Sequence, residues 1–107
     1  MNNYTEIVAG NVNNIQLSGW LVKPVQRVNY DSGASCLKSR IKFYQPSRRG
    51  GEWAQVNIKL WVHKDNRQDV SHALQLKEGD EVVVEGKLSI HDFGGRPYTQ
   101  IVASRLG

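Results

Sequence analysis

Residues 53–62 alternate between apolar and polar side chains almost without interruption. Because successive side chains of a strand point to opposite faces, this pattern predicts a strand with two different faces. One face is aliphatic and suits a core: Ala54, Val56, Ile58, Leu60 and Val62. The other face mixes tryptophan with polar side chains: Trp53, Gln55, Asn57, Lys59 and Trp61. A core would exclude the lysine and a solvated face needs no tryptophan, so we expect this face to bind flat, negatively charged ligands, such as nucleobases on a phosphate backbone.

Residues 37–44 repeat the alternation with a more basic outer face. The outward positions hold three cations and a phenol: Lys38, Arg40, Lys42 and Tyr44. A solvated charged face is the ordinary interpretation of such a row. No carboxylate is interleaved with these cations, which favours a surface for an anionic ligand.

Two predicted hairpin loops carry further candidates. Residues 45–52 contain Pro46 and two glycines that break the flanking strands, with Arg48 and Arg49 near the tip. Residues 92–97 form the second loop, where Phe93 has no evident core to enter and Arg96 lies close by. Phe93 is therefore a candidate for base stacking, and the three arginines are candidates for phosphate contacts.

The remaining segments complete a small barrel. Residues 15–22 predict a first strand, in which Gly19 indicates a bend or bulge and Trp20 is ambiguous between core and ligand contact. A short helix follows residue 62, capped by Asp65 or Asn66, with an apolar stripe of Val70, Ala73 and Leu74, and Gly79 ends it. Residues 81–90 and 98–103 are the last two strands.

The order of five strands with a helix between the third and fourth is typical of an all-β, five-stranded OB-fold Greek-key barrel. That fold binds ligands across strands 2 and 3 and loops 1-2 and 4-5. The two outer faces described above lie on strands 2 and 3, and Phe93 and Arg96 lie in loop 4-5. At 107 residues the chain predicts one domain, spanning 1–107. Residues 1–13 are polar and predict either an N-terminal arm or an extra strand.

Charge and composition narrow the functional classes. Seven of the 14 cations lie between residues 32 and 64, opposed by one acid, Glu52. Such asymmetry is typical of proteins that bind polyanions. No metal-ligand spacing, phosphate-binding glycine loop or nucleophile motif is present, so we expect neither metal, cofactor nor enzymatic activity. The single cysteine, Cys36, and the lack of an apolar leader or membrane span predict a cytoplasmic protein without membrane contact.

Several segments together resemble the bacterial single-stranded DNA-binding proteins. Residues 76–88 are similar to the family's Leu-x-Lys-Gly-x-x-Val-x-Val-Glu-Gly-x-Leu segment, and Glu52 and Trp53 resemble the opening of its third strand. Weaker similarity extends over residues 13–106. The resemblance implies base stacking on Trp53, with Trp61 on the same face, and it implies a homo-oligomer, dimer or tetramer, in bacterial replication, repair or recombination.

The resemblance leaves alternatives open. Replicative members of the family continue into a tail with an acidic tip, whereas this sequence ends at Gly107. It is also similar to a tail-less paralogue, primosomal replication protein N, which implies an adaptor that dimerises and docks replication proteins, with DNA binding secondary. A stacking face separates RNA from DNA poorly, and tryptophan also stacks on sugars, although the unpaired cations favour nucleic acid.

Overall fold

The computed structural model describes residues 13–107, so the predicted arm or extra strand at 1–13 lies outside the described residues except for Asn13. Six strands and one short helix follow one another. The strands are β1 (Ile15–Leu21), β2 (Gln26–Asn29), β3 (Ser35–Ser47), β4 (Gly50–Trp61), β5 (Glu81–Phe93) and β6 (Arg96–Leu106). Between β4 and β5 lie a 3-10 turn, η2 (Lys64–Asn66), and the helix α1 (Arg67–Leu74).

The sheet closes into a barrel. The strand order is β1-β5-β6-β4-β3-β2, and a further pairing of β1 with β3 closes the barrel and leaves β2 outside it. β4 and β6 are parallel, whereas the other pairs are antiparallel. This confirms the predicted OB-fold, with β1, β3, β4, β5 and β6 as its five strands and β2 as an added edge strand.

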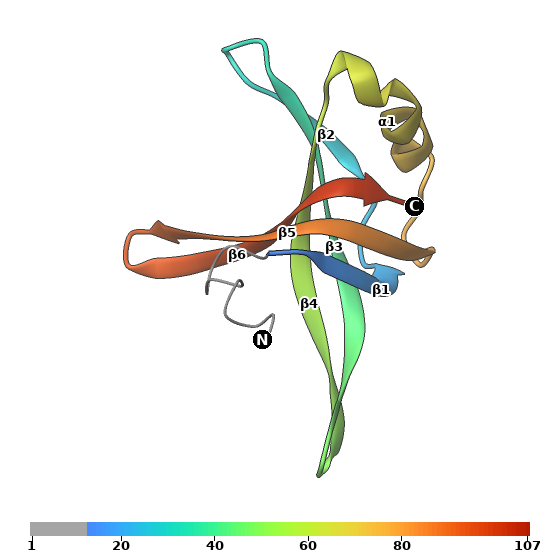
Figure 1. Cartoon of the computed structure of the whole chain (residues 1–107), viewed down its shortest axis with the longest axis vertical. Coiled ribbons are helices and arrows are strands. Elements are labelled where there is room, and N and C mark those ends of the chain that lie inside the picture. Colours follow the sequence, from blue (N-terminus) through green and yellow to red (C-terminus); the bar gives the residue numbers. More distant parts are fainter. Residues whose placement is uncertain (1–12) are drawn as a thin grey trace, which may run out of the picture.

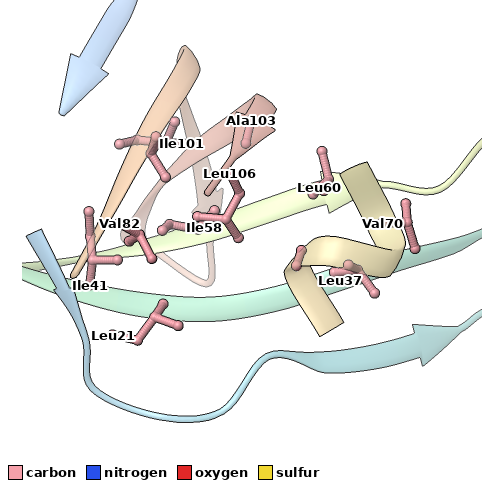
Figure 2. Close-up of a cluster of buried hydrophobic side chains, with 12 residues drawn as sticks. Leu21, Leu37, Ile41, Ile58, Leu60, Val70, Val82, Ile101, Ala103 and Leu106 are labelled. Atoms are coloured by element: carbon pink, nitrogen blue, oxygen red, sulfur yellow. The ribbon is translucent and has the colours of Figure 1, made fainter. Parts of the chain in front are cut away.

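The core lies inside this barrel, where the aliphatic faces of all five strands meet (Figure 2). Ile58 and Leu60 of β4 are buried, as the alternation predicts, and they pack with Leu37, Ile41, Val82 and Ile101. α1 covers one end of the barrel, where Val70 lies near Leu37 and Leu60 (Figure 2). No helix in the described part of the chain is long and apolar enough to cross a membrane.

Three hairpins extend away from the barrel (Figure 1). The two predicted loops are largely strand: β3 continues to Ser47 before β4 begins at Gly50, and β5 continues to Phe93 before β6 begins at Arg96. The predictions of loops at 45–52 and 92–97 were therefore too long. Glycine and proline were taken as strand breakers, but Gly51 and Pro46 pair with each other within the ladder at its exposed end.

The helix is shorter than predicted and is capped differently. It ends at Leu74 rather than near Gly79, and Leu74 is 42% exposed, so only Val70 and Ala73 of the predicted stripe are buried. Asn66 stands at the N-cap, but its side chain bonds backwards: Oδ1 accepts from the His63 N–H at 2.9 Å, and Nδ2 donates to the Trp61 carbonyl at 2.8 Å. These bonds fix the helix start to the end of β4.

Gly19 has a different role from the predicted bend or bulge. The β1–β5 register runs through it without a shift, and the register shift of β5 lies between Glu85 and Gly86. A Cβ atom at Gly19 would overlap the backbone carbonyl oxygen of Lys42. Glycine is therefore required because β1 crosses closely over β3 at this point.

Candidate nucleic-acid interface

The outer face of the β3–β4 ladder brings together the two strand faces that the sequence singled out. Antiparallel pairing places Tyr44 opposite Trp53, Lys42 opposite Gln55, Arg40 opposite Asn57, and Lys38 opposite Lys59. Side chains directly opposite each other on one face are near neighbours. Cations and aromatics from both strands thus form one continuous surface, which we call the ladder face.

Three aromatic rings gather at the outer end of the ladder face. Trp53 lies 5.6 Å from Trp20 and 5.6 Å from Tyr44 between ring centroids, edge to face with both. Lys42 Nζ lies 5.5 Å from the centre of the Trp53 ring, within the range of a cation–π contact. Trp20 comes from β1, which reaches this face because it pairs with Lys42. We call Trp20, Tyr44 and Trp53 the Trp53 cluster.

The rings of this cluster keep much of their surface in solvent. Trp53 is 57% exposed, Tyr44 51% and Trp20 36%. Large aromatic side chains are mostly buried in folded proteins. Three exposed rings in one cluster are therefore unusual for a surface that contacts only solvent. The structure places Trp20 beside Trp53 on the exposed ladder face and not in the core.

Polar side chains occupy the middle of the ladder face. Arg40 Nε donates a hydrogen bond to Asn57 Oδ1 at 3.0 Å, which links the two strands across this face. The cross-strand partners of Lys38 and Lys42 are also uncharged or basic, Lys59 and Gln55. These cations therefore have no carboxylate opposite them and can meet phosphate groups.

A second pair of rings lies at the end of β4 beside the helix. Trp61 lies 5.8 Å from Tyr30 between ring centroids, and Lys59 Nζ lies 5.1 Å from the centre of the Trp61 ring. Tyr30 follows β2, a strand that the sequence did not predict. The position of Tyr30 depends on the pairing of β2 with β3. The β2 segment has no alternation of apolar and polar residues, so its sequence does not reveal this pairing.

The Tyr30 phenol is also tied to the barrel. Tyr30 Oη and Cys36 Sγ are 3.5 Å apart, and Cys36 is fully buried. This hydrogen bond, together with desolvation, raises the pKa of the Tyr30 phenol above its ordinary value. A tyrosine phenol is already uncharged at neutral pH, so the shift does not change the charge that this ring presents there.

The β5–β6 hairpin supplies a third group. Phe93 is 65% exposed and lies 5.9 Å from Tyr98 and 6.2 Å from His91 between ring centroids. A cavity of about 630 Å³ separates this group from Trp61 and the two lysines Lys38 and Lys59. Trp61 and Phe93, predicted separately, thus border the same hollow. Tyr98 and His91 also line it, although the sequence did not select them.

The three arginines of the hairpin ends lie further out. Arg48 and Arg49 form the turn between β3 and β4, at the far end of the ladder from Trp61. Arg96 is the first residue of β6 and pairs directly with Phe93. All three are exposed. In residues 13–107 no group of three or more His, Cys, Asp or Glu side chains could hold a metal ion.

The fold was compared with those of known proteins. No protein-family description and no curated protein sequence matches the chain. Among solved structures, the wild-type single-stranded DNA-binding protein from Thermus aquaticus has a TM-score of 0.66 at 20% identity, over 94% of this chain. The single-stranded DNA-binding domain of a Synechococcus sp. protein has a TM-score of 0.66 at 20% identity, over 92% of this chain and 98% of that one.

The chain has the OB-fold of bacterial single-stranded DNA-binding proteins. The resemblance stated from the sequence is thus confirmed for the fold. The chain spans only 42% of the length of the Thermus aquaticus protein. At 20% identity the similarity establishes the fold alone. The roles of individual residues are therefore argued from the geometry described above.

Proposed function

We propose that this protein binds single-stranded DNA without sequence specificity, in replication, repair or recombination. The observation that carries the proposal is the ladder face, on which exposed aromatic rings alternate with cations that have no carboxylate partner across the strands. Bases stack on such rings for about 1–3 kcal/mol each, and every base offers a π-face. Phosphates meet the cations between the rings.

The strand would follow the ladder from the Trp53 cluster to Trp61. The two rings are eight residues apart on one strand, which corresponds to roughly 26 Å at about 3.3 Å per residue. Lys42, Arg40 and Lys59 lie between them and would contact the backbone of the strand. The hollow bordered by Trp61 and Phe93 would take a further base.

Tryptophan fluorescence offers a direct test, because all three tryptophans, Trp20, Trp53 and Trp61, lie on the proposed path. Titration with poly(dT) at low salt is expected to quench the emission strongly. Added salt should reverse the quenching, because phosphate binding releases counterions. If poly(dT) leaves the emission unchanged at low salt, the proposal is wrong.

A parallel titration with poly(U) measures the preference between DNA and RNA. We expect the affinities for poly(dT) and poly(U) to differ by less than about tenfold, because a stacking surface contacts neither the sugar nor the base edge specifically. Poly(aspartate) serves as the matched polyanion without bases. It should bind far more weakly than poly(dT), whereas equal binding would mean that charge alone and not stacking provides the affinity.

A further inference from the structure

A second groove lies on the opposite side of the β2–β3 hairpin from Trp61. It has a volume of about 550 Å³ and runs between that hairpin and the segment formed by η2 and α1. We call it the helix groove. The β2–β3 hairpin and α1 lie at the same end of the molecule (Figure 1).

The register of the hairpin separates the helix groove from the ladder face. Tyr30 and Cys36 bond to each other on the Trp61 side. Arg27 and Ser35 bond to each other, Nη2 to Oγ at 3.1 Å, and both line the helix groove. Because neighbouring residues of a strand face opposite ways, Ser35 and Cys36 project from opposite faces of the hairpin. DNA on the ladder face therefore leaves the helix groove open.

The lining of the helix groove combines positive charge with apolar surface. Arg27 of β2, Lys64 of η2 and Arg67 of α1 supply the cations, and His63 lies beside them. The apolar part includes Val70, which is buried, and Leu74, which is 42% exposed. Among the lining residues, all within 13–107, none is acidic and none is Phe, Tyr or Trp.

The acids nearest in sequence, Asp31, Asp65 and Asp69, are not among the residues that line the helix groove. Asp69 of α1 lines a different hollow, together with Glu85 and Arg105 near the end of the chain. The side of the short helix that lines the helix groove thus carries basic and apolar side chains, and Asp69 lies outside that lining. Leu74 would gain from burial, at roughly 25 cal/mol per Å² of apolar surface removed from water.

We propose that the helix groove binds a peptide segment of a partner protein in which acidic residues flank an apolar side chain. The cations match the acidic residues, and the exposed Leu74 with Val70 matches the apolar one. A nucleic acid fits less well, because the groove has no phenylalanine, tyrosine or tryptophan ring on which a base could stack. This site is additional to the proposed DNA function, and both ligands can be held at once.

The test uses the whole protein and a fluorescein-labelled peptide in which aspartates flank leucine and phenylalanine. Binding is followed by fluorescence polarisation, first alone and then with saturating poly(dT). The variant Lys64→Glu/Arg67→Glu is expected to weaken peptide binding by about tenfold or more, since each reversal turns an attraction into a repulsion. Glutamate at position 67 is tolerated, because acidic residues are favourable in the first turn of a helix.

The control variant Lys77→Glu/Arg105→Glu makes the same change in net charge outside the helix groove and should leave peptide binding nearly unchanged. Leu74→Ser should weaken binding without altering any charge, and a peptide with asparagine in place of aspartate should bind poorly. Displacement of the peptide by poly(dT) would overturn the proposal, because it would place the peptide on the ladder face. Equal losses in the two charge-reversal variants would overturn it as well.

Discussion

Trp53 illustrates how one side chain can be exposed and still have a fixed position. Its ring contacts Trp20, Tyr44 and the ammonium of Lys42, yet more than half of its surface remains open. Such contacts orient the ring before a base arrives, so less side-chain entropy is lost on binding. They also mean that removing the ring should affect binding more than folding.

Replacement of Trp53 by alanine is expected to cost about 1–3 kcal/mol of DNA binding. The melting temperature should change little, because the ring is 57% exposed. Anisotropy of a labelled oligo(dT) measures the first quantity, and circular dichroism the second. Val83→Ala, an exposed apolar position of β5, is the control and should bind normally. An unfolded Trp53→Ala protein would show instead that the ring supports the barrel.

Gly19 is a position at which the barrel backbone leaves no room for a side chain. Gly19→Ala places a methyl group against the Lys42 carbonyl oxygen, which is backbone and cannot swing away. We expect a loss of about 1–3 kcal/mol in the free energy of unfolding, as for other overpacked sites. Urea denaturation measures it, with Ser18→Ala on the same strand as the control. A stability equal to that of the control would show that β1 and β3 can separate freely.

Among the elements, the β3–β4 hairpin positions most of the proposed site. Twelve cross-strand pairs align its two strands from Cys36–Trp61 to Ser47–Gly50. Its inner part forms one wall of the barrel and its outer part extends beyond it (Figure 1). The same hairpin therefore supplies core residues such as Ile41 and Ile58 and carries the basic turn of Arg48 and Arg49 into solvent.

That turn can be tested through the salt dependence of DNA binding. The double variant Arg48→Gln/Arg49→Gln is expected to flatten the plot of log K against log salt by about 0.7 for each lost phosphate contact. Lys77→Gln/Arg105→Gln removes the same charge away from the ladder face and should leave the slope unchanged. Equal slopes for all three proteins would mean that the turn does not reach the DNA backbone.

At the scale of the whole molecule, an apolar surface on the β5–β6 hairpin is exposed in the part of the chain that the structure describes. Ile90 is 60% exposed and Leu88 39%, and both lie on the face of the β5–β6 hairpin opposite to Tyr98. The pairing of Leu88 with the buried Ile101 places this surface next to the core. Exposed apolar patches of this kind are typical of protein–protein interfaces.

We therefore expect a homo-oligomer of two or four chains. Sedimentation equilibrium should give a mass above that of one chain, and Ile90→Asp should shift the protein towards the monomer because a carboxylate is costly to bury. Ser89→Asp, one residue earlier and on the other face, is the control. A wild-type protein that sediments as a monomer at micromolar concentration would contradict the expectation.

The sequence alone determined the five barrel strands and the two faces of β3 and β4. Alternation with a period of two is a local property, and burial of Ile58 and Leu60 follows from it directly. The position of Trp53 and Trp61 outside the core was settled in the same way. The OB-fold followed because the order of strands and helix leaves few ways to close a small barrel.

Only the tertiary structure decided how the faces combine. β2 has four residues and no apolar alternation, so its pairing with β3, and with it the contact between Tyr30 and Trp61, could not be read locally. The close crossing at Gly19 and the hollow between Trp61 and Phe93 join residues distant in sequence. The reason is physical: a sequence pattern fixes which way a side chain points along its own strand, whereas its neighbours depend on register and closure.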